Sequence, residues 1–279
     1  MRNTLQWKYD STLKVEKVRT GRISSLIISR KDKQGKGPGV LWIHGGGYIT
    51  GMKEMAFIGR AVDLVKKFDI TVVSPGYRLA WIAPYPAALD DCYQALLYMK
   101  EHCEQLGVRS DQIMVGGESA GGGLAAALCL LARDRKEVRI AYQMPLYPML
   151  DNFDTETSAA NHGRVWNTFR NHIGWKMYLR KDAGQPVSPY ASVARAKDYS
   201  DLPPAYTFVG DQEPFYSETR TYIENLKKAG IWARMDIYHT NMHAFDILRP
   251  KDGISEKAVQ KFEEEFAYAM NHYFSAQVK

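Results

Sequence analysis

Residues 113–132 read IMVGGESAGGGLAAALCLLA. The apolar run IMVG leads into the G-x-S-x-G pattern of residues 117–121, and an alanine-rich stretch with helical composition follows. A serine at such a strand-turn-helix junction is held in a strained backbone conformation that only small flanking residues allow, and its hydroxyl projects beside a helix N-terminus. This placement predicts that Ser119 is a nucleophile. A glycine-rich turn that only packs a helix against a strand would leave a similar pattern.

The chain on either side of Ser119 alternates between short apolar or β-branched runs and helical patterns. Strand followed by helix, repeated, predicts an α/β protein with a mostly parallel sheet covered by helices on both faces. Residues 13–29 add two β-rich runs parted at Gly21, which predicts an opening antiparallel hairpin or meander. The expected strands are 40–44, 70–74, 112–116, 139–145, 205–210 and 233–239, and the expected helices are 54–68, 86–105, 119–133, 217–229 and 255–274.

The composition is that of an ordinary globular protein, with 279 residues, 45% hydrophobic and 24% charged. An α/β fold of this length is often one unit, so we expect a single domain over residues 1–279. Residues 151–187 have aromatic residues at helical spacing and no strand signal, and we expect them to form an inserted cap. Aromatics there would either line a ligand pocket or pack as ordinary core. They are Phe153, Trp166, Phe169, Trp175 and Tyr178.

Composition also bears on location and partners. The first twelve residues hold no signal-peptide core, and no stretch approaches the roughly 20 apolar residues that span a bilayer, so we expect a cytoplasmic protein without a membrane partner. Cys92, Cys103 and Cys129 are odd in number and far apart, which indicates neither a disulfide framework nor a metal site. The formal charge of +6 is scattered along the chain, so nucleic-acid binding is not expected.

A second motif, His44-Gly45-Gly46-Gly47-Tyr48, directly follows the expected strand 40–44 and begins 75 residues before Ser119. Consecutive glycines let backbone N–H groups turn toward one point, which suits the oxyanion of a tetrahedral acyl intermediate. A glycine-rich loop can also cradle phosphate. However, neither G-K-[ST] nor G-x-G-x-x-G with a following acidic residue is present, which disfavours a nucleotide site.

Four segments together resemble the hormone-sensitive-lipase-like carboxylesterases, bacterial family IV, of the α/β-hydrolase fold: HGGGY at 44–48, YRLA at 77–80, GESAGGGLA at 117–125 and LPPAY at 202–206. The resemblance runs from about residue 38 to 248. It implies an eight-stranded, mostly parallel sheet and a small helical cap. It also implies a serine-acid-histidine triad and an oxyanion hole from the N–H groups of Gly46, Gly47 and Ala120. The expected activity is hydrolysis of short acyl esters without a cofactor.

Five histidines follow Ser119, and they differ in context. His243 lies in a loop after the last expected strand, where the resembled family has its H-[GA]-F motif, and we expect it to be the general base. His44 precedes the nucleophile, so its expected task is to hydrogen-bond and shape the glycine loop. The remaining candidates are His162, His172, His239 and His272.

The triad acid has two candidates, Asp211 and Glu213, because both lie just past a strand end. The resembled family has Asp-Pro-Leu followed three residues later by an acidic residue, and Glu213-Pro214-Phe215 with Glu218 matches that register. Glu213 is also 30 residues before His243. The register therefore favours Glu213, with Asp211 left open. A glutamate can replace the common aspartate, since the need is an ionised carboxylate that orients the imidazole.

Other functions remain open on sequence alone. The same triad hydrolyses amides or lactones in other enzymes, and a hydrolase scaffold without activity can act as a binding protein. The expected partner is a small-molecule ester. Related proteins often form dimers, and the sequence does not decide whether this chain is a homodimer.

Overall fold

The computed structural model describes residues 10–277 and contains one eight-stranded sheet in the order β1-β2-β4-β3-β5-β6-β7-β8. Residues 1–9, where we expect no signal peptide, lie outside the described residues. The strands are β1 (Leu13–Thr20), β2 (Ile23–Arg30), β3 (Gly37–Ile43), β4 (Thr71–Pro75), β5 (Val108–Glu118), β6 (Tyr142–Leu146), β7 (Ala205–Gly210) and β8 (Ala233–Tyr238).

The first two strands form the antiparallel hairpin that the sequence predicts. Gly21 adopts a φ of +59° in the turn between them, a left-handed conformation that glycine takes without steric cost. β2 pairs with β4 antiparallel, whereas the pairs from β4 through β8 are parallel. The inner strands β3, β4 and β6 are buried along their whole length, which is why they read as apolar runs rather than as alternating patterns.

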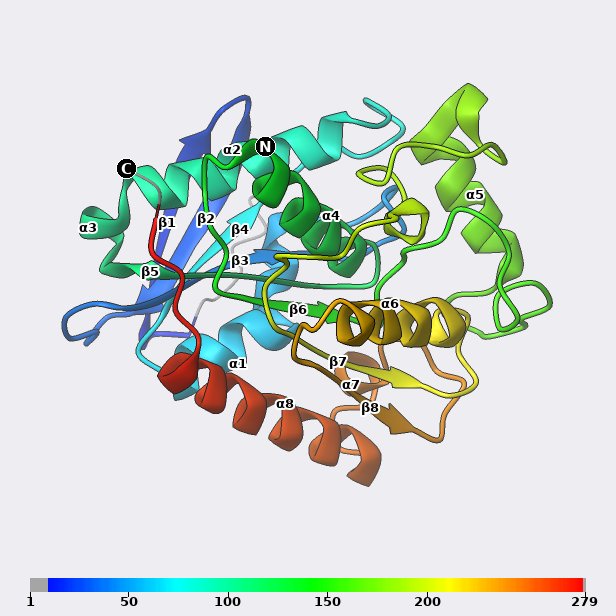
Figure 1. Ribbon diagram of the computed structural model, residues 1–279. Helices are drawn as coiled ribbons and strands as arrows, with labels where there is room; N and C mark the ends of the chain where they lie inside the picture. Colours follow the sequence, from blue (N-terminus) through cyan, green and yellow to red (C-terminus); the bar gives the residue numbers. More distant parts are fainter. Residues whose placement is uncertain (1–9, 278–279) are drawn as a thin grey trace, which may run out of the picture.

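Helices cover both faces of the sheet (Figure 1). One core includes side chains of α2 (Ala87–Glu101), α4 (Ala120–Arg135) and α6 (Tyr216–Lys228). The core on the opposite face includes side chains of α1 (Arg60–Lys67) and α8 (Gly253–His272). Shorter elements are η1 (Lys53–Phe57), α3 (Cys103–Leu106) and α7 (Phe245–Leu248). The predicted α/β architecture is confirmed.

The expected helix over 54–68 is interrupted. The chain forms η1 first, and α1 begins only at Arg60, after Gly59. The backbone N–H of Arg60 donates a hydrogen bond of 3.2 Å to the carboxylate of Glu118, which satisfies an N–H at the start of the helix. A methyl group on Gly59 would lie 3.3 Å from the Glu118 carboxyl carbon and closer still to its Oε1. The buried carboxylate therefore fixes where α1 starts.

Residues 151–187 contain no strand and one α-helix, α5 (Thr168–Leu179), followed by η2 (Arg180–Asp182). The Asn167 side chain caps α5 by accepting a hydrogen bond from the Arg170 N–H. In Figure 1, α5 lies beyond the arrowheads of the parallel strands, at the edge of the sheet where Ser119 follows β5. None of the helices within residues 10–277 is both long enough and apolar enough to cross a membrane.

Candidate active site

Ser119 stands between β5 and α4 with φ of +57° and ψ of −121°. This conformation is strained for a residue with a side chain, and it persists because the surroundings are packed tightly. A methyl group on Gly117 would lie 2.7 Å from Gly121, and one on Gly121 would lie 2.7 Å from the carbonyl carbon of Ile43. The two glycines of the motif are thus required by the close passage of β3, β5 and the start of α4.

The Ser119 side chain belongs to a chain of hydrogen bonds. Its Oγ lies 2.8 Å from His243 Nε2, and His243 Nδ1 lies 2.5 Å from Glu213 Oε2. All three residues are buried, with exposed fractions of 6% for Ser119, 4% for His243 and 0% for Glu213. The three residues singled out from the sequence, far apart along the chain, therefore meet at the carboxyl ends of β5, β7 and β8.

Asp211, the alternative acid, points elsewhere. Its Oδ2 lies 2.9 Å from Nδ1 of His239, and its Oδ1 accepts a hydrogen bond of 3.2 Å from the Thr240 N–H. The side chain of His239 is 82% exposed. Asp211 therefore holds the surface loop after β8, two residues away from the buried carboxylate that reaches His243.

The remaining histidines lie outside the hydrogen-bonded chain. His172 Nε2 is 2.7 Å from Asp154, and His272 Nδ1 is 2.8 Å from the Tyr268 carbonyl within α8. His162 is exposed. His44 is buried, and burial lowers its pKa to about 4, so its ring is neutral near neutral pH. Its Nδ1 lies 2.8 Å from the Gly45 carbonyl, and its ring stacks on Tyr77.

The glycine loop after β3 carries left-handed backbone conformations, with φ of +116° at Gly46 and +60° at Gly47. Its N–H groups at Gly46 and Gly47 have no hydrogen-bond partner among the described residues, and neither does that of Ala120. A methyl group on Gly45 would lie 3.2 Å from Ser119 Cβ, which shows how closely the loop passes the serine. The loop thus brings unpaired backbone donors beside Ser119.

Glu118, directly before Ser119, is buried beneath the site. It accepts a hydrogen bond of 2.8 Å from Trp42 Nε1 as well as the N–H of Arg60. Burial raises its pKa to about 7, against the opposing effect of these two donors. A carboxyl group thus lies beneath the serine without facing the solvent.

A second buried carboxylate, Asp246, lies three residues after His243. It accepts a hydrogen bond of 2.9 Å from the Tyr147 hydroxyl, and Arg60 Nε lies 3.2 Å from its other oxygen. Burial raises the pKa of Asp246, and the Arg60 charge opposes that shift. The ring of Tyr147 in turn packs edge-on against His243, with centroids 5.1 Å apart. Arg60 therefore links the segment before the serine to the segment after the histidine.

Sequence reasoning missed this network of Trp42, Arg60, Glu118, Tyr147 and Asp246. Glu118 occupies a variable position of the G-x-S-x-G motif, and the motif does not indicate that its side chain is buried. The sequence gives one indication for Asp246, because an acidic residue among the apolar residues that follow His243 is unusual and suggests a buried polar contact. The sequence gives no indication for Arg60 and Tyr147, since they meet Glu118 and Asp246 only where four separate segments come together in the fold.

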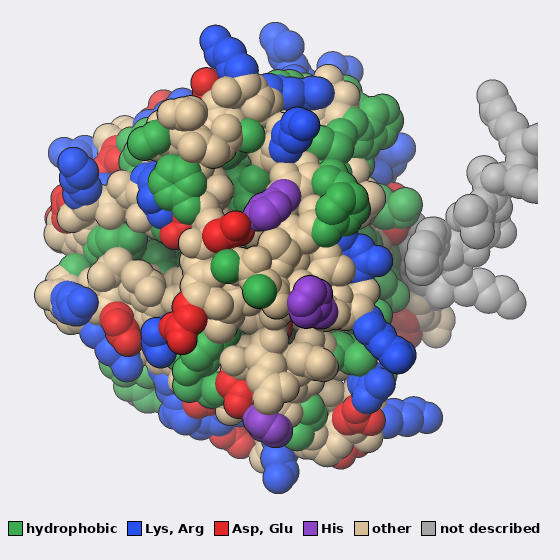
Figure 2. Space-filling model, turned by 90° about the vertical axis from the view of Figure 1, so that its right-hand side faces the viewer, with side chains coloured by type: hydrophobic (Ala, Val, Ile, Leu, Met, Phe, Trp, Pro, Cys, Tyr) green, Lys and Arg blue, Asp and Glu red, His purple; other side chains and the backbone are tan. Residues whose placement is uncertain are grey.

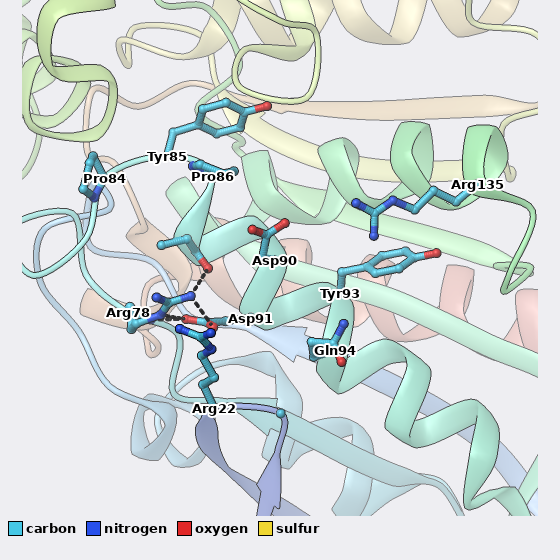
Figure 3. Close-up of a pocket in the computed structure, with 12 residues that line it drawn as sticks. Arg22, Arg78, Pro84, Tyr85, Pro86, Asp90, Asp91, Tyr93, Gln94 and Arg135 are labelled. Carbon is cyan, nitrogen blue, oxygen red and sulfur yellow. Dashed lines mark hydrogen bonds and ion pairs between the residues drawn. The ribbon is translucent and has the colours of Figure 1, made fainter.

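No cluster of histidine, cysteine, aspartate and glutamate within residues 10–277 is arranged to hold a metal ion. Cys92, Cys103 and Cys129 are buried free thiols. The wide cavity of about 780 Å³ shown in Figure 3 lies apart from the triad, between the β1–β2 turn and α2. In it, Arg22 reaches toward the bidentate ion pair of Arg78 with Asp91, whose closest atoms are 2.8 Å apart.

The face above the carboxyl ends of the strands is shown in Figure 2. Hydrophobic, basic and acidic side chains are interspersed on it, and histidines reach the surface. Phe169 at the start of α5 is the most exposed of the large hydrophobic side chains among the described residues, at 72%.

Comparison with known proteins agrees with this fold and motif set. Residues 40–247 match a family described as the alpha/beta hydrolase fold. An arylesterase of Saccharolobus solfataricus is 32% identical over 211 residues, which cover 74% of this chain and 67% of that protein. The esterase LipI of Mycobacterium tuberculosis is also 32% identical, over 76% of this chain and 67% of its own length.

Solved structures give the same result. A bacterial heroin esterase superposes with a TM-score of 0.88 at 30% identity, covering 93% of this chain and 85% of that one. An esterase of the archaeon Pyrobaculum calidifontis superposes with a TM-score of 0.81 at 31% identity, covering 91% of this chain and 82% of that one. The chain belongs to the α/β-hydrolase family, in its hormone-sensitive-lipase-like branch of carboxylesterases.

Proposed function

We propose that this protein is a serine carboxylesterase that hydrolyses short-chain acyl esters through an acyl-enzyme, with Ser119, His243 and Glu213 as its triad. The observation that carries the proposal is the continuous hydrogen-bonded chain from Ser119 Oγ through the imidazole to the Glu213 carboxylate. The names of its relatives, which are esterases, support the bond type.

The geometry assigns a role to each group. An ionised Glu213 can only accept hydrogen bonds, so His243 Nδ1 carries the proton and Nε2 is free to accept from Ser119 Oγ. As the serine oxygen attacks the ester carbonyl, its proton passes to Nε2, and the protonated imidazole then gives this proton to the leaving alcohol. Water repeats the sequence on the acyl-enzyme and releases the acid.

The developing oxyanion needs donors that are already oriented. The unpaired N–H groups of Gly46, Gly47 and Ala120 flank Ser119, and we assign them this role. Removal of one such donor in a serine hydrolase costs roughly 3 kcal/mol of transition-state stabilisation. The glycine loop therefore contributes on the same scale as the orientation of the triad.

The test is hydrolysis of p-nitrophenyl acetate, butyrate, octanoate and decanoate by the unsubstituted protein and by Ser119→Ala. We expect turnover of the short esters that the substitution abolishes. Turnover that persists in Ser119→Ala would refute the assigned nucleophile, and a protein that cleaves amides or lactones but no ester would refute the assigned bond. The cytoplasmic location, the lack of membrane and nucleic-acid partners and the oligomeric state stay predictions.

A further inference from the structure

Residues 161–166 contact the three loops that carry the site. Asn161 Nδ2 donates a hydrogen bond of 3.1 Å to the carbonyl of Gln212, next to Glu213. A methyl group on Gly163 would lie 3.4 Å from the carbonyl oxygen of Asn241, in the loop that carries His243. The segment ends at Trp166, whose ring reaches the glycine loop.

Trp166 rests directly on Gly47. A methyl group on Gly47 would lie 2.7 Å from Cζ2 and 3.0 Å from Cζ3 of the Trp166 ring, and closer still to its Cη2. A methyl group on Gly174 of α5 would lie 3.4 Å from the same ring. The indole therefore fills the space between α5 and the loop whose N–H groups lie beside Ser119.

The ring is held in place by its neighbours. Its Nε1 donates a hydrogen bond of 3.3 Å to Oδ1 of Asn171, which is itself buried on α5. Arg170 Nη1 donates to the carbonyl of Val165 at 2.7 Å and to that of Arg164. A bulky side chain whose polar atom is bonded, and whose two preceding carbonyl groups are also bonded, forms a fixed wall.

The position of the Trp166 ring determines whether it contacts the acyl chain or the alcohol of a bound ester. The leaving alcohol must lie beside His243 Nε2, because that atom gives it a proton. The aromatic rings in contact with His243 are those of Tyr147 and Phe215. Among the described residues, Trp166 makes no ring contact with His243; it packs beside Phe215, with centroids 6.5 Å apart, and its edge lies on Gly47 of the glycine loop. The substituent of the carbonyl carbon nearest to Trp166 is then the acyl chain.

We propose that Trp166 sets the upper limit of acyl-chain length, so that acetyl and other short acyl groups fit between its indole and Ser119 while longer chains collide with it. This inference rests on the proposed function, since it concerns the acyl side of the same site. It assigns to Trp166, among the aromatic residues of segment 151–187, a contact with substrate rather than core packing alone.

The experiment compares the unsubstituted protein with Trp166→Ala and Trp166→Leu on p-nitrophenyl esters of two to ten carbons. We expect kcat/KM for the octanoate, relative to the acetate, to rise about tenfold or more in Trp166→Ala, because each methylene buried in the new space contributes roughly fourfold. Trp166→Leu keeps part of the wall and gives a smaller rise. The matched control is Phe169→Ala, which removes an exposed ring on the same segment and leaves the ratio unchanged.

A second series varies the alcohol of acetate esters, from methyl to phenyl, with the acyl group constant. An alcohol profile in Trp166→Ala that is unchanged from that of the unsubstituted protein supports the assignment. An unchanged octanoate-to-acetate ratio, an equal loss on all esters or a change confined to the alcohol series overturns it. Failure of the proposed function itself is visible separately, because it concerns the unsubstituted protein and Ser119→Ala rather than a ratio between esters.

Discussion

The indole N–H of Trp42 donates a hydrogen bond of 2.8 Å to the carboxyl group of Glu118, the residue directly before Ser119. Trp42 lies on β3 and Glu118 ends β5, and the two strands are neighbours in the sheet. The carboxyl group also receives the N–H that begins α1. The buried acid next to Ser119 thus joins β3, β5 and the start of α1.

Glu118 makes stability depend on pH. Burial raises its pKa from the ordinary value of 4.5 to about 7, so between these pH values the native state holds a proton that the unfolded state has lost. The free energy of unfolding therefore falls as the pH rises from 4.5 through about 7, by about 3 kcal/mol from this group. Glu118→Gln should remove that contribution, as urea unfolding at about pH 5 and about pH 8 would measure.

The control for this prediction is Glu104→Gln, since the Glu104 side chain is 81% exposed. It should unfold with the same pH dependence as the unsubstituted protein. An equally steep fall of stability with pH in Glu118→Gln would show that other buried acids, such as Asp246, produce the dependence.

Substitution of Glu213 and of Asp211 tests which of these two neighbouring carboxylates orients His243. Glu213→Gln removes the charge that orients His243 and stabilises its protonated form, so kcat should fall by about 10³- to 10⁴-fold. Asp211→Asn alters a carboxylate that bonds exposed His239 and should leave kcat within about twofold. Steady-state kinetics on p-nitrophenyl acetate measures both. A larger fall in kcat for Asp211→Asn than for Glu213→Gln would make Asp211 the acid of the triad.

The ion pair between Arg60 and Asp246 should matter for stability. Arg60→Met leaves Asp246 buried without its cation, and removal of one member of such a pair costs about 3–5 kcal/mol. The double variant Arg60→Met with Asp246→Leu removes both charges and should recover part of that loss. Urea unfolding of the four proteins forms a double-mutant cycle. Additive losses would mean that the two charges do not interact.

Gly47→Ala should reduce turnover without unfolding the protein. The alanine must adopt a φ of +60°, and its methyl group meets the Trp166 ring, so the loop and its N–H groups shift. We expect kcat for p-nitrophenyl acetate to fall by about 10²- to 10³-fold, as after loss of one oxyanion donor. Gly35→Ala is the control, because Gly35 has a φ of +69° but nothing within 4 Å of the added methyl group.

Adding Trp166→Ala to Gly47→Ala tests the cause of that loss. The double variant removes the ring that the new methyl group meets, so part of the turnover should return. If the double variant is no more active than Gly47→Ala, the left-handed backbone alone accounts for the effect and the contact with Trp166 does not.

The sequence by itself determined the order of strands and helices, the α/β-hydrolase family and the residues at the centre of the site. It could do so because each depends on local pattern: apolar runs make buried parallel strands, and small residues around Ser119 permit its strained turn. The same locality explains its errors. It predicted one helix over 54–68, since nothing near those residues shows that the Glu118 carboxylate starts α1 at Arg60.

Only the tertiary structure decided between Asp211 and Glu213 as the partner of His243. Both follow β7, two residues apart, and the turn directs one side chain to the surface and the other into the core, 2.5 Å from the imidazole. The contact of Trp166 with Gly47 and the ion pair of Arg60 with Asp246 likewise join residues more than 100 positions apart. Such contacts depend on how helices and loops pack over the finished sheet, and no periodicity along the chain encodes them.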